Sequence, residues 1–155
     1  MEGDIKSRYR EIGLNCVCFN LRKASRVVSQ LYDTALKPSG LKATQFPILL
    51  VAYVLPEPNM TSMAKMLAMD RTTLTRNLRV LEREGLLEIR PGKDQRKKVV
   101  HLTDDAKSSI ENGIPLWEEA QVMIMGHLDS INWEGLVKDL RRISAKGTKV
   151  GEGVR

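Results

Sequence analysis

The middle third of the chain constrains the fold most, because its hydrophobic period changes there from that of a helix to that of a strand. A short helical segment, 62–67, is followed closely by Asp70, a favoured N-cap, and by a longer helical pattern that ends at Gly85. Two helices spaced so closely predict a helix-turn-helix. Two β-prone runs, 86–90 and 98–102, then flank a polar turn and predict a hairpin.

Helical patterns also precede and follow this segment. Apolar side chains recur at three-four spacing over 14–35, which is typical of a helix packed against another helix. A further helix is expected over 44–55, with Thr44 as its N-cap. Thr103, followed by two aspartates, predicts a helix to about residue 128, and a last helix is expected over 132–144. The predicted fold is therefore mainly α with a small β hairpin.

The positive charge of the chain is concentrated in this middle third. The net charge is +6, and residues 71–98 alone hold nine basic and four acidic side chains. Residues 1–70 hold nine and six, whereas residues 99–155 hold seven and nine. An anionic partner is therefore expected to meet the predicted second helix and the hairpin.

The second helix has one apolar face and one basic face. Leu74, Leu78 and Leu81 share the face that must be buried, at about 100° per residue. The opposite face carries side chains that can bond base edges or phosphates, namely Thr72, Arg76, Arg79 and Arg83. The hairpin adds basic residues that can follow a DNA backbone or enter a minor groove, namely Lys93, Arg96, Lys97 and Lys98. The alternatives are a solvated basic face and a hairpin kept soluble by its lysines.

The run MDRTTLTRNLRVLEREG (69–85), followed by LLEIRPGKDQRKKVVHLTDDA (86–106), resembles the multiple-antibiotic-resistance regulator (MarR) family of winged helix-turn-helix transcription factors. GLKATQF (40–46) and MTSMAKMLAMD (60–70) also fit the family. Its Asp-x-Arg wing element stands here as Asp94-Gln95-Arg96, in which we interpret Asp94 as orienting the guanidinium of Arg96. The resemblance implies that Thr72, Thr73, Thr75, Arg76 and Arg79 lie in the major groove and that Arg96 serves the wing. Together with the basic residues above, the expected DNA-binding residues are Arg71, Thr72, Thr73, Thr75, Arg76, Arg79 and Arg83 in the recognition helix, and Lys93, Asp94, Arg96, Lys97 and Lys98 in the wing.

The resemblance also implies a homodimer that binds a pseudo-palindromic operator in double-stranded DNA. Independently, two adjacent faces of the helix that begins after Thr103 are apolar, one with Ile110, Ile114, Trp117, Ile124 and Leu128 and the other with Leu116, Ala120 and Met123. That arc is broad for one packing partner, so it favours a dimer over an ordinary core helix. We expect an N-terminal dimerisation helix over 1–38, a winged helix-turn-helix domain over 41–103, C-terminal dimerisation helices over 104–146 and a flexible tail over 147–155.

The family binds small-molecule or oxidant effectors between the dimerisation helices and the DNA-binding lobe. Cys18-Phe19 stand where the organic hydroperoxide resistance regulators of this family carry a peroxide-sensing pair, and Tyr32 matches one assisting tyrosine, whereas Ala43 replaces the second. Cys18 and Tyr32 are therefore candidate redox-sensing residues, and the alternative for Cys18 is a small buried hydrophobe. On one continuous helix Cys16 and Cys18 are about 200° apart, so they are not expected to bridge.

Several classes of protein are disfavoured by what the sequence lacks. It contains no HExxH, GxSxG, Walker A or glycine-rich dinucleotide motif, so an enzyme is not expected, and neither is a cofactor or a bound metal. We find no membrane span or secretory signal and only two cysteines, which predicts a cytoplasmic protein. The favoured function is a DNA-binding transcriptional regulator, most simply a repressor, and the alternative is a winged-helix module that binds another protein.

Overall fold

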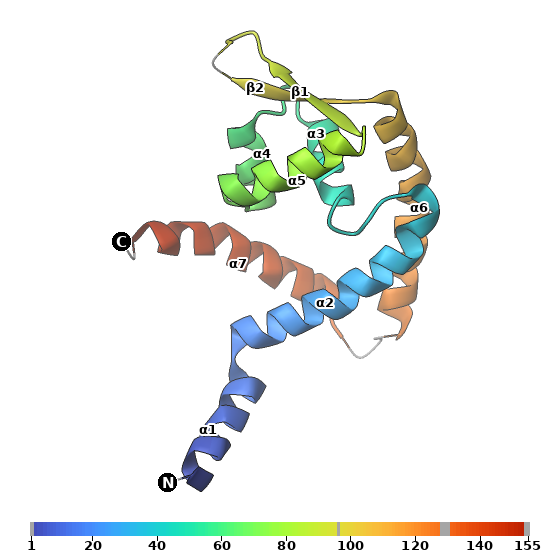
Figure 1. The fold of residues 1–155 in the computed structure, drawn as a ribbon. Helices are drawn as coiled ribbons and strands as arrows, with labels where there is room; N and C mark the ends of the chain where they lie inside the picture. Colours follow the sequence, from blue (N-terminus) through green and yellow to red (C-terminus); the bar gives the residue numbers. More distant parts are fainter. Residues whose placement is uncertain (1, 96, 128–130, 154–155) are drawn as a thin grey trace.

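The structure is a computed structural model that describes residues 2–95, 97–127 and 131–153, and it is mainly helical with one small sheet (Figure 1). The elements in chain order are α1 (Glu2–Asn15), α2 (Val17–Leu36), a 3-10 turn (Lys37–Ser39), α3 (Phe46–Val54), α4 (Met60–Leu67), α5 (Arg71–Arg83), β1 (Leu87–Pro91), β2 (Lys98–Leu102), α6 (Asp104–His127) and α7 (Trp133–Gly153). Figure 1 shows α3, α4, α5 and the hairpin gathered in one lobe, with α2, α6 and α7 beside it. The predicted fold class is confirmed.

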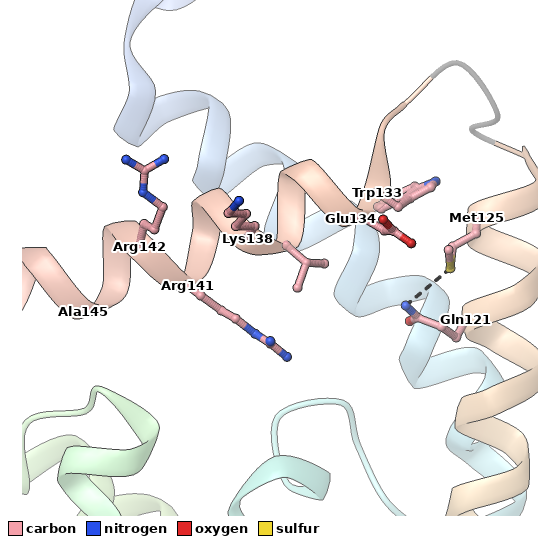
Figure 2. A pocket seen from close by; sticks show the side chains of 9 residues that line it. Gln121, Met125, Trp133, Glu134, Lys138, Arg141, Arg142 and Ala145 are labelled. Carbon is pink, nitrogen blue, oxygen red and sulfur yellow. Dashed lines mark hydrogen bonds between the residues drawn. The ribbon is translucent and has the colours of Figure 1, made fainter.

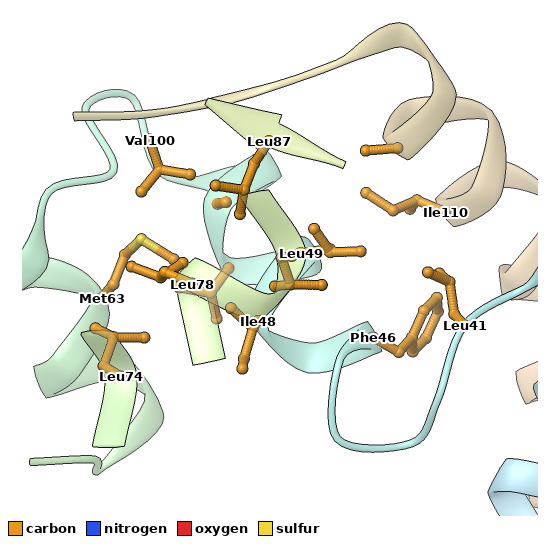
Figure 3. Close-up of a cluster of buried hydrophobic side chains, with 14 of the residues drawn as sticks. Leu41, Phe46, Ile48, Leu49, Met63, Leu74, Leu78, Leu87, Val100 and Ile110 are labelled. Carbon is orange, nitrogen blue, oxygen red and sulfur yellow. The ribbon is translucent and has the colours of Figure 1, made fainter. Parts of the chain in front are cut away.

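The core of the lobe is built around the apolar face of α5. Leu74, Leu78 and Leu81 are each no more than 1% exposed. They belong to the same buried cluster as side chains of α3, α4 and both strands, of which Figure 3 labels Ile48, Leu49, Met63, Leu87 and Val100. Burying an aliphatic side chain of this size contributes about 1.5–3 kcal/mol. This burial fixes which face of α5 points outward.

Side-chain caps set the starts of α4 and α5. Asp70 accepts hydrogen bonds from the backbone N–H of Thr73 at 2.8 Å and from its hydroxyl at 2.6 Å, so the predicted N-cap is confirmed. The start expected at residue 62 is wrong by two residues, because Asn59 caps α4 in a capping box with Ser62. The turn between the two helices passes through Ala68, whose φ is +51°.

The hairpin is antiparallel, and its second strand is paired with the segment that precedes α4. Its register pairs Leu87 with Leu102 and Pro91 with Lys98, so the second strand has the predicted bounds and the first is shifted by one residue. Asn59 forms an isolated bridge with Val99 on the outer side of β2. The wing is therefore held directly against the N-terminus of α4.

The N-terminal region differs from the prediction of one continuous helix starting near residue 14. Cys16 has φ −71° and ψ 113°, which interrupts the helix and separates α1 from α2. The side chain of Asn20 donates to the carbonyls of Leu14 and Cys16 at 3.1 and 3.0 Å, and Cys16 Sγ accepts from the N–H of Phe19. These bonds satisfy groups that the break leaves unpaired. The separation of about 200° expected for Cys16 and Cys18 assumed a continuous helix, so it does not apply.

Two further helix boundaries differ from the prediction. Gln45, not Thr44, is the residue before α3, and Pro47 lies in the first turn of this helix. The Gln45 side chain does not cap α3; it accepts a hydrogen bond from the N–H of Lys42. The last helix starts as predicted, because the Asn132 side chain accepts from the N–H of Gly135. It continues to Gly153, so the backbone is helical over part of the segment for which we expected a flexible tail.

Candidate nucleic-acid interface

The outward face of α5 is a shallow basic surface. A hollow of about 530 Å³ on this face is lined by Arg71, Thr72, Thr75, Arg76, Arg79, Val80 and Arg83. No acidic side chain lines it, and the buried leucines lie on the opposite side of the same helix. The structure therefore brings together six of the seven residues predicted for the recognition helix. The seventh, Thr73, uses its hydroxyl in the Asp70 cap and does not line the hollow.

The wing brings further lysines to the edge of this surface. The hairpin tip is closed by bonds from the Gly92 N–H to the Lys97 carbonyl at 2.7 Å and from the Lys97 N–H to the Asp94 carbonyl at 2.8 Å. Gly92 suits this turn because a Cβ there would lie 2.8 Å from a Val99 methyl. Lys93, Asp94, Lys97 and Lys98 are all exposed. The predicted wing arginine, Arg96, lies outside the described residues.

A second hollow lies between the wing and α5, and some of the residues that line it were not predicted from the sequence to bind DNA. It has a volume of about 400 Å³ and is lined by Asn59, Met60, Thr61, Arg71, Thr75, Lys97 and Lys98. Arg71 Nη2 donates to Thr61 Oγ1 at 2.7 Å. The sequence signal that could have pointed to Thr61 was Asn59, a favoured N-cap residue. A helix that Asn59 caps starts at residue 60, which places the Thr61 side chain in its first turn.

An apolar hollow of about 440 Å³ lies where α3 meets α2 and α6. Its lining residues carry no charge: Val28, Ser29, Tyr32, Leu36, Ala43, Phe46, Pro47, Leu50, Trp117 and Gln121. The Tyr32 hydroxyl donates to Gln121 Oε1, and burial raises the pKa of Tyr32, so this phenol is neutral at pH 7. Cys18 is exposed and does not line the hollow, so within one chain the structure does not bring the two candidate redox residues together.

Side-chain hydrogen bonds connect the loop between α2 and α3 to α2 and to the C-terminal end of α5. Asp33 Oδ1, on α2, accepts from the N–H of Ala43 at 2.7 Å. Gln45, which is 9% exposed, donates to Glu84 Oε2 at 2.6 Å, just after the last residue of α5. The loop between α2 and α3 therefore contacts both the apolar hollow and the end of the basic helix.

Figure 2 shows a fourth hollow, between α6 and the start of α7, which has a volume of about 580 Å³. Its lining mixes apolar and basic side chains, and Arg141 and Arg142 point to different sides of α7. The indole Nε1 of Trp133 is buried here and finds no hydrogen-bond partner within the part of the chain that the structure describes.

Large apolar side chains remain exposed on the helices beside the lobe. They are Ile5, Tyr9 and Ile12 on α1, Val17, Leu21, Val27 and Leu31 on α2, Ile114, Trp117 and Met123 on α6, and Leu136, Val137, Leu140 and Ile143 on α7. The apolar residues predicted to form a broad arc on α6 fall into two groups. Ile110, Ala120 and Ile124 are buried within the chain, whereas Ile114, Trp117 and Met123 are exposed. Leu128, also assigned to that arc, lies outside the described residues. Exposed apolar side chains in this number are typical of helices that have an interaction partner.

Two other kinds of site are absent from residues 2–95, 97–127 and 131–153. None of the helices formed there has both the length and the hydropathy needed to cross a bilayer. The same residues include no cluster of three or more histidine, cysteine, aspartate or glutamate side chains that could hold a metal ion.

Comparison with known proteins gives matches in sequence and in structure. The model of the MarR family matches residues 41–99. The transcriptional regulator MosR of M. tuberculosis, solved in complex with DNA, is 34% identical with a TM-score of 0.79, over 88% of this chain and 98% of that one. A second MosR structure gives 32% identity and a TM-score of 0.73, over 87% and 97%. The Bacillus subtilis protein YwoH, an uncharacterised HTH-type transcriptional regulator, is 26% identical over 91 residues, which span 59% of this chain and 66% of YwoH.

Proposed function

The chain belongs to the MarR family of transcriptional regulators, and on that premise we propose that it binds double-stranded DNA in a sequence-specific manner. Its proposed role is regulation of transcription in the cytoplasm, most simply as a repressor that covers a promoter. A small molecule or an oxidant would release it from the operator.

The basic surface of α5 is the observation that carries this proposal. Arg76, Arg79 and Arg83 lie on the face opposite the buried leucines, with no carboxylate in the hollow that they line. Arginines on such a face can bond guanine edges bidentately. The wing lysines lie beside them and can neutralise backbone phosphates. The DNA complex of MosR supports the same assignment, because MosR shares the fold over nearly its whole length.

We propose that the active species is a two-fold dimer formed through α1, α2, α6 and α7. The exposed apolar side chains on these helices support this arrangement. Two symmetric lobes would bind a pseudo-palindromic operator with half-sites about one helical turn apart.

Binding of a labelled duplex at increasing salt tests the proposed function. A sequence-specific regulator should prefer one site over random DNA, and its affinity should fall steeply with salt. Weak binding without sequence preference would favour the alternative, a winged-helix module that binds another protein.

The apolar hollow at Tyr32 is the proposed effector site, and Cys18 is a candidate oxidant sensor. The hollow supports an uncharged effector, because no charged side chain lines it. Treatment with an organic hydroperoxide should release wild-type protein from the operator but not Cys18→Ser, if Cys18 is the sensor. Equal release of both would leave Cys18 without a sensing role.

A further inference from the structure

The hollow between the wing and α5 is formed by three separate segments that the fold holds together. Asn59 and Thr61 come from the start of α4, Arg71 from the start of α5 and the lysines from the start of β2. The Val100 N–H donates to the Pro58 carbonyl at 2.8 Å, next to the Asn59 bridge. The positions of Lys97 and Lys98 relative to α4 are therefore set by backbone bonds.

The chemistry of this hollow suits one anionic group. Three of its lining side chains are cations, Arg71, Lys97 and Lys98, and none of the described residues that line it is a carboxylate. The backbone N–H groups of Thr61 and Ser62 already donate to the Asn59 side chain, so the helix terminus itself is satisfied. Any bound anion would depend on the cationic side chains.

Thr61 restrains the guanidinium of Arg71. A free arginine side chain has many rotamers, and the bond of 2.7 Å from Nη2 to Thr61 Oγ1 fixes its far end beside the hollow. A guanidinium has five N–H donors, so this bond leaves the others for a ligand. The Thr75 hydroxyl donates to the Arg71 carbonyl at 2.7 Å and so does not compete for that guanidinium.

We propose that Thr61, Arg71, Lys97 and Lys98 form a binding site for one phosphate of the DNA backbone, located between the wing and the recognition helix. Arg71, Lys97 and Lys98 neutralise the phosphate, and Thr61 is a positioning residue that acts through Arg71. Arg71 thus sets the register of the protein on the duplex and reads no base. This inference rests on the proposed DNA-binding function.

Variants of Thr61 provide the first test. Thr61→Val removes the hydroxyl with little change of shape and should weaken binding to operator and to random duplex by the same factor, roughly three- to tenfold. Thr61→Ser keeps the hydroxyl and should bind like wild type. Thr34→Val is the control, because Thr34 is exposed on α2 and its hydroxyl bonds only within that helix. Thermal unfolding should be the same for all three variants.

The coupling of Thr61 to Arg71 distinguishes positioning from a merely structural role. Arg71→Ala should lower the slope of log affinity against log salt by about one unit, for any sequence. Adding Thr61→Val to Arg71→Ala should cause no further loss. Additive losses, or a loss confined to the operator, would overturn the assignment.

Duplexes in which a single phosphate is replaced by a neutral methylphosphonate locate the contact. One position in each half-site should weaken wild type more than it weakens Arg71→Ala, because Lys97 and Lys98 still meet that phosphate in the variant. If every position weakens both proteins alike, the site is not a phosphate site even though the protein binds DNA. If wild type shows no salt-dependent affinity for any duplex, the proposed function fails together with this inference.

Discussion

At the scale of single residues, arginines on the same helix are expected to make different contacts with DNA because their surroundings differ. Arg76 and Arg71 both line the hollow on the outward face of α5, but Arg71 is in addition bonded to Thr61 of another helix. A side chain free to enter a groove can select a base, and one fixed at the edge of the interface can only meet the backbone.

Comparison of Arg76→Ala with Lys97→Ala tests this division. Arg76→Ala should lower affinity for the operator by about 1–3 kcal/mol and reduce the preference over random DNA. Lys97→Ala should weaken both DNAs by a similar factor and flatten the salt slope by about one unit. Titrations of both duplexes at several salt concentrations measure these quantities. Unchanged operator binding by both variants would show that this surface is not the interface.

Asp70 gives a prediction in pH. Hydrogen bonds from the Thr73 hydroxyl and then from the Thr73 N–H lower the pKa of Asp70 below its ordinary value of 3.8. The folded state therefore favours the carboxylate, and this contribution is present above about pH 4 and lost as the pH falls through the folded pKa. Asp70→Ala should lower the Tm at pH 7, and its difference from wild type should shrink below pH 3.8. A Tm difference that is independent of pH would contradict this account.

At the scale of elements, the parts of the fold that follow from local patterns could be predicted from the sequence. The α5 helix and its buried leucines follow from hydrophobic period and from the Asp70 cap, and the hairpin follows from two β-prone runs around a turn. The break at Cys16 could not be predicted from period, because the apolar spacing continues across it. It depends on hydrogen bonds from Asn20 to carbonyls of the preceding helix.

The candidate site was predictable to the same extent. The position of the α5 arginines follows from the face opposite Leu74, Leu78 and Leu81, and all the recognition-helix residues except the capping Thr73 line one hollow, whereas their contact with DNA stays a prediction. The Thr61–Arg71 pair joins two helices, and neither helix alone implies it. To predict this pair, one needs the angle between α4 and α5 at the Ala68 turn, and the hydrophobic period of the sequence gives no information about that angle.

The contact of α6 with α3 gives a prediction about stability. A Cβ on Gly113 would lie 2.9 Å from Cε2 of the buried Phe46. Overpacking costs about 1–3 kcal/mol, which exceeds the gain of about 1 kcal/mol from replacing glycine in a helix. Gly113→Ala should therefore lower the free energy of unfolding, as measured with urea. Gly126→Ala is the matched control, because it lies in the same helix with open space around it and should not destabilise. A stabilised Gly113→Ala would contradict the packing described.

At the scale of the whole molecule, the exposed apolar side chains of the outer helices are the basis of the proposed dimer. Leu136, Val137, Leu140 and Ile143 are between 37% and 51% exposed along one side of α7. Leaving such a row in water is unfavourable, and symmetric pairing of two chains is the commonest way to bury it.

Sedimentation velocity tests the proposed dimer. Wild type should sediment as a dimer at micromolar concentration, and Leu140→Asp should shift it towards monomer because a charge is then buried without a partner. Lys93→Asp serves as the control, since Lys93 is exposed on the wing and lies on none of these helices. A monomeric wild type, or a Leu140→Asp variant that remains dimeric, would contradict the proposed interface.

The central claim is that the outward face of α5 recognises a specific DNA site, and selection of genomic fragments tests it most directly. Purified wild type and Arg76→Ala would be incubated with sheared DNA from the source genome, and the bound fragments sequenced. We expect wild type to enrich a pseudo-palindromic site with half-sites about one helical turn apart, and Arg76→Ala to lose that enrichment while still retaining DNA at low salt. Enrichment of no sequence by wild type, or of the same site equally by Arg76→Ala, would contradict the claim.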